Sequence, residues 1–596
     1  MKYPKLRELN TFREMVDVFK GYNHNLRIGD GEFYDMKNLS SDNYPILSPR
    51  HKRGIYATPN NPQGMVAKDD LCYIDGGDFI IAENRVSMEL TTNDKKPKNL
   101  ISMGAYVIIM PDKKYINTVP KDDGSYEHGN IEASVKTTTP VTFKMCKVDG
   151  EEYDKMSVQA TPPAEPNNMD LWIDTSGTPH QLKQYSSTTA MWSVIATTYI
   201  KISATGIGKP FSVNDGVTIS GVENLPDLNA SMVIWAKGED YIVVAGLLDQ
   251  VTTQDTPITI ERKMPNMDFI IESENRLWGC RYGTALNGEI VNEIYASKLG
   301  DFKNWNCFMG ISTDSYVASV GSDGQFTGAI THLGYPLFFK ENCLHKVYGN
   351  YPANYQIQTT ACRGVQKGSD RSLAIVNEVL YYKSYLGVCA YDGSLPQEVS
   401  SALGDIRYYN AVAGALGNKY YISLQTPEWG WIPEEEKYGE RMGDKLFVYD
   451  TLKGMWHKED DTGAWVFCNC RGDLYYIDYA DRQIKTVKGT AGVAEDERIE
   501  WEAITGIIGT DSPDKKYISR IDVRMSLQVG TRVILSAEYD SSGEWEHLFT
   551  MAGTNLRSFA VPIKPKRCDH LRLRIEGLGD AKIYSICKKI EGGSDV

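Results

Sequence analysis

One short pattern recurs along this chain: two runs of alternating apolar and polar residues, joined by a tight turn and followed by an aromatic residue. The clearest copy spans Asn275–Phe308, where the runs flank Asn287-Gly288 and a second turn at Gly300-Asp301 leads to Trp305. Alternation with a period of two predicts half-buried strands, and Asn-Gly predicts a hairpin turn. The chain is therefore expected to build a series of small antiparallel sheets.

The spacing of this pattern indicates how the sheets are arranged. Further copies span Tyr335–Gly349, Val379–Gly393 and Leu446–Trp456, and the interval of about 40 to 55 residues is typical of propeller blades. One blade cannot bury both of its faces, whereas a closed ring of blades buries all but the outermost edges. We expect an all-β fold, a six- to eight-bladed β-propeller with an inserted β domain and a C-terminal β-sandwich.

Changes in sequence character divide the chain into five parts. Residues 1–20 place apolar residues at helical spacing, which predicts an N-terminal arm or a short helix. Residues 21–118 hold the first propeller blades and residues 266–490 the remaining ones. Between them, residues 119–265 exchange the aromatic pattern for Thr-rich alternation and are predicted to be an inserted all-β domain. Residues 498–596 alternate again and predict a separate C-terminal β-sandwich.

Composition excludes several classes of protein. The net charge of -14 argues against a surface that grips nucleic acid throughout, because phosphate contacts need clustered Lys and Arg. No apolar stretch approaches 18 residues and the N-terminus has no apolar signal core, so neither a membrane span nor a secretory signal is expected. The eleven Cys are odd in number and irregular in spacing, which favours buried thiols folded in a reducing compartment.

The sequence contains few motifs that indicate catalysis or ligand binding. There is no P-loop, no His-Glu-x-x-His and no Gly-x-Ser-x-Gly, and the nine His form no cluster with ligand spacing. We therefore predict no catalytic residues, no cofactor and no metal, and a protein that is not an enzyme. A propeller glycosidase stays open as an alternative, because paired carboxylates on such a fold can do acid-base work.

Two stretches are candidate interfaces. The basic run with Arg50, Lys52 and Arg53 is either a solvated rim or a contact to another subunit or to a DNA backbone. Trp429 and Trp431 lie in a long, charged connection from Gln425 to Gly443, where an exposed aromatic pair would be an interaction surface.

The residues also resemble a known group of proteins. The chain is similar to bacteriophage propeller proteins of the tail hub, nozzle or packaged-DNA stabilisation type, over roughly residues 20–118 and 266–490. The resemblance is carried by Gly21-Tyr22-Asn23, Asp30-Gly31-Glu32, Asp35-Met36-x-Asn38, Leu47-x-x-Arg50, Arg53-Gly54, Arg276-Leu277-Trp278, Glu293-Ile294-Tyr295-Ala296-Ser297, Gly300-Asp301-Phe302-x-x-Trp305, Phe338-Phe339-Lys340-Glu341-Asn342 and Ala390-Tyr391-Asp392-Gly393.

The resemblance implies a virion structural protein, folded in the host bacterial cytoplasm. It would form a homo-oligomer, a ring (a hexamer by expectation) around the DNA channel, and would contact other tail or head–tail connector proteins. DNA would pass without specific contacts during ejection, and a negative lumen would not hold it back. The alternative is a tail protein that binds host-surface glycan through the inserted or the C-terminal β domain.

Overall fold

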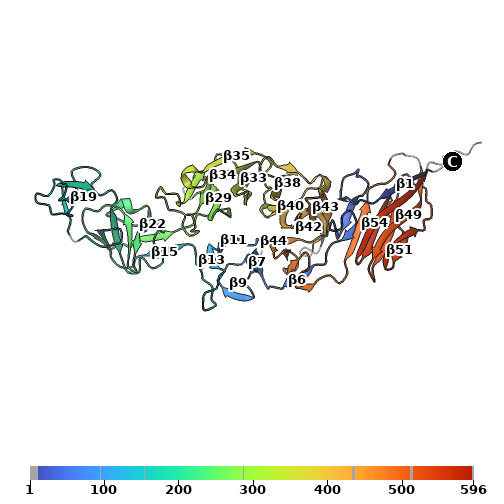
Figure 1. Cartoon of the computed structure of the whole chain (residues 1–596), viewed down its shortest axis with the longest axis horizontal. Helices are drawn as coiled ribbons and strands as arrows, with labels where there is room; N and C mark the ends of the chain where they lie inside the picture. The colour runs from blue at the N-terminus through green and yellow to red at the C-terminus, as the bar shows by residue number, and fades with distance from the viewer. Residues whose placement is uncertain are drawn as a thin grey trace, which may run out of the picture.

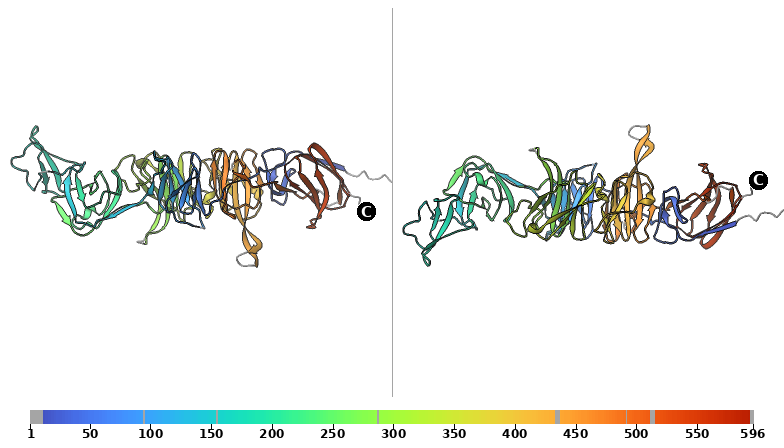
Figure 2. Two further views of the ribbon diagram at one scale, coloured as in Figure 1. Left: turned by 90° about the horizontal axis from the view of Figure 1, so that it is seen from below. Right: turned by 90° about the horizontal axis from the view of Figure 1, so that it is seen from above.

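The protein is represented by a computed structural model that describes residues 11–93, 95–153, 155–285, 288–432, 437–490, 492–510 and 515–592. The molecule is elongated, with the inserted domain at one end, a group of small sheets in the middle and a β-sandwich at the other end (Figures 1 and 2). The described helices are four single 3-10 turns, η1 (Pro226–Leu228), η2 (Pro352–Asn354), η3 (Asp370–Ser372) and η4 (Ser401–Leu403). The prediction of an all-β, propeller-like fold is confirmed.

Seven small sheets form the middle of the molecule, and we number them in chain order. Their strands are, in sheet 1, β7 (Pro62–Ala67), β8 (Leu71–Asp75), β9 (Asp78–Ile81) and β10 (Asn84–Ser87); in sheet 2, β11 (Asn99–Met103), β12 (Tyr106–Met110), β13 (Lys114–Asn117) and β14 (His128–Asn130); in sheet 3, β28 (Phe269–Ser273), β29 (Arg276–Thr284), β30 (Ile290–Ala296) and β31 (Tyr316–Ser319); in sheet 4, β32 (Gly328–His332), β33 (Tyr335–Lys340), β34 (Cys343–Tyr348) and β35 (Gln356–Ala361); in sheet 5, β36 (Ala374–Val376), β37 (Val379–Lys383), β38 (Val388–Tyr391) and β39 (Gln397–Glu398); in sheet 6, β40 (Tyr409–Leu416), β41 (Lys419–Ile432), β42 (Lys437–Asp450) and β43 (Met455–Lys458); and in sheet 7, β44 (Ala464–Cys470), β45 (Asp473–Asp478), β46 (Ile484–Thr486), β6 (Gly54–Ala57) and β47 (Val493–Ala494).

The first strands of these sheets meet in a closed cycle. β7 contacts β11, β11 contacts β28, and β28 contacts β32; η3, which directly precedes β36, contacts both β32 and β40; β40 contacts β44, and β44 returns to β7. Sheet 7 joins the two ends of the ring, because β6 precedes sheet 1 in the chain yet pairs with β46, with Thr486 opposite Gly54. The ring is thus held shut by backbone hydrogen bonds between an early and a late segment.

Apolar clusters fill the spaces between neighbouring sheets. Trp278 of sheet 3 packs in one cluster with Phe338 of sheet 4, and Trp305 shares another with Ile108 of sheet 2. Both indoles are buried. Fully burying such a side chain stabilises the fold by about 1.5–3 kcal/mol. The aromatic residues of the recurring pattern are therefore packing residues between sheets.

Tight turns set the shape of each sheet. Glu274 and Asn275 join β28 to β29 with φ of 50° and 60°, and Asn377 and Glu378 join β36 to β37 with φ of 49° and 66°. Two successive left-handed residues define a type I′ turn, whose twist matches that of antiparallel strands. The predicted turn at Asn287-Gly288 includes Asn287, which lies outside the described residues; β29 and β30 on either side of it pair as expected, with Thr284 opposite Ile290.

The inserted domain leaves the ring after β14 and returns before β28. Its predicted start at residue 119 is too early, because β14 pairs with β13 in sheet 2. The domain has three sheets around one apolar core. Their strands are β15 (Ala133–Lys136), β27 (Thr259–Arg262), β22 (Gly216–Ser220) and β23 (Ser231–Val233); β24 (Ala236–Lys237), β25 (Tyr241–Ala245), β21 (Tyr199–Ser203), β16 (Val141–Cys146) and β26 (Thr252–Gln254); and β17 (Ser157–Gln159), β18 (Leu171–Asp174), β19 (Gln181–Ser186) and β20 (Met191–Val194). A buried ion pair of Arg262 with Asp215, which also accepts a hydrogen bond from Asn304, fixes its base to sheet 3.

The β-sandwich is built from both ends of the chain. One sheet holds β1 (Thr11–Val16), β54 (Ala581–Gly592), β49 (Lys516–Leu527) and β52 (Asn555–Val561). The other holds β3 (Glu32–Lys37), β48 (Glu500–Thr505), β53 (Leu571–Leu578), β50 (Arg532–Tyr539) and β51 (Trp545–Ala552), and it continues through β2 (Gly21–Tyr22) into β43 of sheet 6. A small ladder of β4 (Leu39–Ser40) and β5 (Ser48–Pro49) lies beside it.

Two predictions for the N-terminal part of the chain are wrong as a result. The helix considered for residues 1–20 is a strand over Thr11–Val16, because pairing with β54 satisfies its backbone groups; residues 1–10 lie outside the described residues. Residues 21–53, predicted as propeller, instead contribute β2 to β5, and Phe33 and Met36 pack in the same core as Ile575 of the sandwich.

Candidate interaction hairpin and the basic junction

The hairpin of β41 and β42 extends beyond the sheet that carries it. β40 pairs with β41 only as far as Gln425, and β43 pairs with β42 only over Phe447–Asp450. From Thr426 to Ile432 the two strands pair with each other alone. At about 3.3 Å per residue this two-stranded arm reaches ~23 Å past the sheet. Figure 2 shows it projecting sideways from the long axis of the molecule.

Polar contacts fix the base of the arm. Gln425 Nε2 donates to Asp444 Oδ1 at 3.0 Å, and Lys445 Nζ reaches Glu428 at 2.6 Å and Asp461 at 2.7 Å. Burial raises the pKa of the Asp444 carboxyl above its ordinary value. These contacts hold the arm in one direction where it leaves the sheet.

The register gives the arm two different faces. Pro427 lies opposite Met442 and Trp429 opposite Glu440, and Tyr438 continues the alternation of Glu440 and Met442, so these residues share one face. Three of their side chains are strongly exposed, Trp429 by 78%, Tyr438 by 66% and Met442 by 43%. On the other face, Glu428 lies opposite Arg441 and the Arg441 side chain crosses Gly430, where any larger residue would collide with it.

This geometry refines the predicted site. Trp429 is exposed as predicted, whereas the side chain of Trp431 and residues 433–436 lie outside the described residues. The stretch Gln425–Gly443, predicted to be a long, charged connection, consists in its described parts of two strands. Sequence reasoning missed Tyr438 and Met442, because their place on the face of Trp429 depends on the register of the two strands.

The basic run lies inside the molecule, at the junction of ring and sandwich. Arg53 is 4% exposed and contacts Glu459 and Asp460, each at 2.8 Å; Arg50 is 8% exposed and contacts Asp496 at 2.8 Å. Burial opposes ionisation of Asp460, but Arg53 and Arg50 outweigh it and hold the pKa of that carboxyl below its ordinary value. The carboxylates come from the chain after β43 and from the chain that returns to the sandwich.

The prediction of Arg50 and Arg53 as a rim or as a contact to a subunit or DNA is therefore wrong. Both guanidinium groups are buried and form ion pairs with carboxylates of the same chain, since a buried charge needs a partner. Lys52 between them is exposed, and its Nζ donates to the Glu497 carbonyl at 2.8 Å. The three residues are not one surface, and only Lys52 faces solvent.

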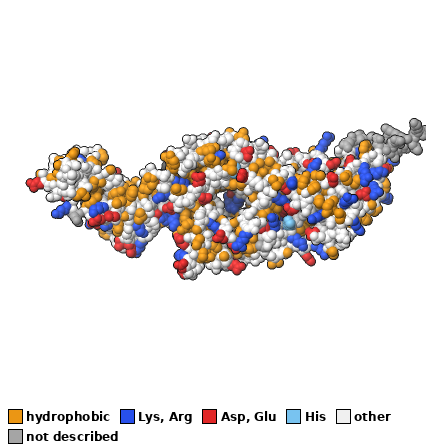
Figure 3. All heavy atoms as spheres, viewed as in Figure 1, with side chains coloured by type: hydrophobic (Ala, Val, Ile, Leu, Met, Phe, Trp, Pro, Cys, Tyr) orange, Lys and Arg blue, Asp and Glu red, His pale blue; other side chains and the backbone are white. Residues whose placement is uncertain are grey.

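A side chain also spans the centre of the ring. Arg371 of η3, before sheet 5, donates from Nη2 to the carbonyl of Pro97, before sheet 2, at 2.7 Å. Sheets 2 and 5 are not neighbours in the cycle, so this bond reaches across the centre of the ring. Figure 3 shows the middle of the ring hollowed, with basic side chains inside the hollow. Burial lowers the pKa of the Arg371 guanidinium.

The described residues hold no group of three or more His, Cys, Asp or Glu placed to bind a metal ion. None of the described helices is long and apolar enough to cross a membrane. All eleven cysteines are free, and burial raises the pKa of several thiols, that of Cys72 to about 12 and that of Cys146 to about 11. These thiols are poor nucleophiles, since the reactive form is the thiolate.

Comparison with known proteins gives distant likenesses. No family model and no curated protein matches the chain. An exo-β-1,3-galactanase from Phanerochaete chrysosporium aligns at 9% identity and TM-score 0.22 over 54% of this chain and 94% of its own. PorZ, a surface component of the type-IX secretion system of Porphyromonas gingivalis, aligns at 11% identity and TM-score 0.25 over 89% and 77%. A sialidase from Trypanosoma rangeli aligns at 10% identity and TM-score 0.21 over 91% and 95%.

These structures correct one prediction. Glycoside hydrolases are among them, which contradicts the expectation that the protein is not an enzyme, and that exclusion is withdrawn. TM-scores this low carry no argument for a particular activity in this chain.

Proposed function

We propose that this protein is a structural component of a bacteriophage tail, a hub- or nozzle-like ring of identical chains around the DNA channel. The observation that carries the proposal is the β41–β42 arm, which holds Trp429, Tyr438 and Met442 exposed on one face. A two-stranded ribbon is only marginally stable alone, and exposed aromatic residues are enriched at interfaces. An arm of this kind gains stability when a neighbouring chain covers it. The resemblance of the sequence to ring-forming tail proteins supports the same conclusion.

The seven sheets are, in this proposal, the blades of one closed seven-bladed propeller within each chain. Because Arg371 spans the centre of that ring, DNA would pass through the lumen between chains and not through the propeller itself. The net charge of -14 per chain suits a lumen that does not retain phosphate. Further partners would be other tail or head–tail connector proteins, and the location would be the virion after folding in the bacterial cytoplasm.

Electron microscopy and mass photometry of the purified full-length protein test this proposal. We expect closed rings, with masses at multiples of the 66.8 kDa chain and six copies as the expected order. The double variant Trp429→Ala, Tyr438→Ala should release single chains, because loss of an aromatic anchor at an interface costs about 2 kcal/mol or more. Tyr385→Ala is the matched control, since Tyr385 is 58% exposed and lies outside the arm.

Two outcomes would count against the proposal. A wild-type protein that stays a single chain at all concentrations contradicts ring formation. Rings that survive the double variant unchanged contradict the role of the arm.

A further inference from the structure

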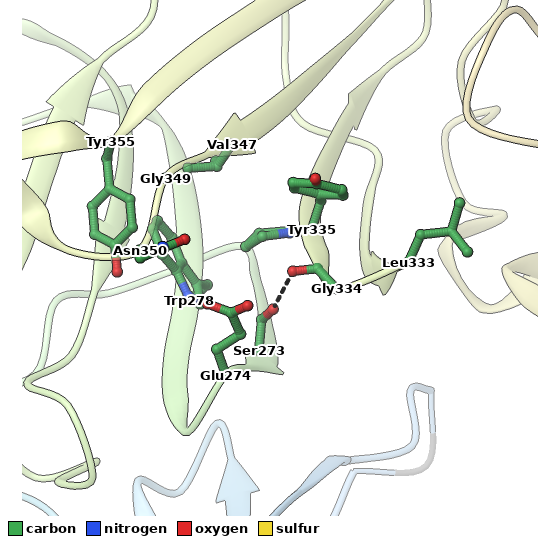
Figure 4. A pocket seen from close by; sticks show the side chains of 11 residues that line it. Ser273, Glu274, Trp278, Leu333, Gly334, Tyr335, Val347, Gly349, Asn350 and Tyr355 are labelled. Atoms are coloured by element: carbon green, nitrogen blue, oxygen red, sulfur yellow. Dashed lines mark hydrogen bonds between the residues drawn. The ribbon is translucent and has the colours of Figure 1, made fainter.

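A pocket of about 150 Å³ lies between sheets 3 and 4, apart from the arm and from the junction (Figure 4). Its floor and walls come from β29, β33 and the segment after β34, and its rim from the two turns Glu274-Asn275 and Leu333-Gly334. The volume is below the roughly 300 Å³ of pockets for drug-sized ligands and suits about one small ring.

Aromatic side chains form the pocket walls. Trp278 is 2% exposed, and its ring meets that of Tyr355 edge to face with centroids 5.0 Å apart. Tyr316 supports Tyr355 from behind at 5.1 Å. Tyr335 stands at the rim and is 36% exposed. The walls are therefore rigid on the inner side and open to solvent on the outer side.

A buried arginine orders this wall further. The Arg276 guanidinium carbon lies 6.0 Å from the Tyr355 ring centroid, and the group donates to the carbonyls of Ser297 at 2.7 Å and Ser312 at 2.8 Å. Because carbonyl oxygens occupy these donors, Arg276 supports the pocket instead of presenting a charge to it.

Four polar side-chain groups of the pocket make no hydrogen bond to the described residues of the protein. Within the described part of the chain, no hydrogen bond is made by the Trp278 indole N–H, the Glu274 carboxylate, the Asn350 side-chain amide or the Tyr355 hydroxyl. Figure 4 shows these four side chains pointing toward one another. Burial and the nearby Glu274 raise the pKa of Tyr355, so its hydroxyl stays a donor. An indole N–H normally finds a partner, and all four groups line the pocket, where a ligand can meet them.

We propose that this pocket binds one neutral sugar ring of a glycan. The aromatic walls match the apolar C–H face of a sugar, the Glu274 carboxylate and Asn350 oxygen accept from its hydroxyls, and the Trp278 N–H donates to one. The carboxylate repels anionic ligands, which excludes phosphate and acidic sugars. This site lies in the propeller, not in the inserted or C-terminal domain, and it goes beyond the proposed structural function, because a single chain could bind a sugar without assembling.

Saturation-transfer NMR of the full-length protein tests the proposal with glucose, galactose, N-acetylglucosamine and rhamnose, and with N-acetylneuraminic acid as the anionic comparison. At least one neutral sugar should bind with a Kd of about 1 mM, the range of a small ligand with few contacts. Glu274→Gln and Trp278→Phe should each weaken that binding by about tenfold or more, since each removes a polar partner of the sugar. The anionic sugar should show no transfer.

Glu378→Gln is the matched control, because Glu378 is a residue of the equivalent turn of sheet 5 and lies outside the pocket. It should bind as the wild type does. No transfer to any of the four neutral sugars, or equal binding by the wild type and both pocket variants, would overturn the proposal. Since Trp278→Phe also changes the core, the conservative Glu274→Gln at the rim decides the case if the Trp variant does not fold.

Discussion

Arg53 at the junction of ring and sandwich should be among the most sensitive single positions in the chain. Replacing it with Met keeps most of the side-chain volume but removes contacts to Glu459 and Asp460 at 2.8 Å each, and a hydrogen bond to Thr462 at 2.8 Å. Glu459 is itself 3% exposed, so its charge would lose a buried partner. Breaking a buried ion pair from one side costs about 3–5 kcal/mol.

That loss can be measured as a shift in thermal unfolding. In a large domain, 1 kcal/mol corresponds to about 2 °C, so Arg53→Met should lower the Tm of the transition that includes the ring by ~8 °C at pH 7. Differential scanning calorimetry of the full-length protein follows it directly. Lys52→Met is the control, because Lys52 is exposed and such a surface change should stay within about 0.5 kcal/mol.

A double variant separates the ion pair from simple packing. Combining Arg53→Met with Glu459→Gln also removes the charge of the Glu459 carboxylate. The double variant should therefore recover part of the lost stability, since most of the destabilisation comes from that carboxylate without its Arg53 partner. The reasoning is refuted if Arg53→Met costs less than about 1 kcal/mol, or if Lys52→Met costs as much.

Three further predictions follow from the same structure. The pKa values of the Asp460 and Asp496 carboxyls are held below the ordinary value in the folded protein. Their contribution to stability should therefore be complete above about pH 4 and disappear as the pH falls through the lower pKa values of the folded state. As a result, the Tm should fall more steeply with acid in the wild type than in Arg53→Met. Deleting residues 1–16 should lower the stability of the sandwich by about 2 kcal/mol, because the buried Lys588, 5% exposed, loses its ion pair with Glu14 at 3.1 Å. The deletion also uncovers the edge of β54, so light scattering should show aggregation. Unchanged unfolding would contradict the pairing of β1 with β54. Replacing residues 427–442 by Asn-Gly should leave the Tm of the ring within about 2 °C but abolish assembly, as seen by mass photometry, since the described strand residues of this segment form backbone pairs only with one another.

Local patterns were a good guide to the strands of the ring. The stretch Asn275–Phe308 contains β29 and β30 and the packing residue Trp305, since alternation and turn chemistry are properties of neighbouring residues. The same reasoning gave the wrong sheet for residues 21–53. A strand such as β3 reads alike whether it joins a blade or a sandwich, and its partner β48 lies more than 460 residues further on.

The candidate site shows the same limit. A run of charges in the sequence does not show which of them are buried, because Arg50 and Arg53 meet carboxylates about 400 residues away. Trp429 could be found because an aromatic residue among charged ones is conspicuous, whereas Tyr438 and Met442 required the register of the hairpin. The pocket between sheets 3 and 4 had no signal in the sequence, since its wall and rim residues come from two sheets brought together by packing.

The pairing of β6 with β46 also fixes when the ring can be completed during synthesis. β6 ends at Ala57 and leaves the ribosome early, yet its partner β46 begins only at Ile484. At translation rates of about 5–20 residues per second, Gly54–Ala57 waits some 20 to 80 seconds for its pairing strand. We expect sheets 1 to 6 to form during that interval as an open arc with both end edges uncovered. The nascent chain is therefore expected to need protection by chaperones throughout its translation, and to gain its full stability in one late step.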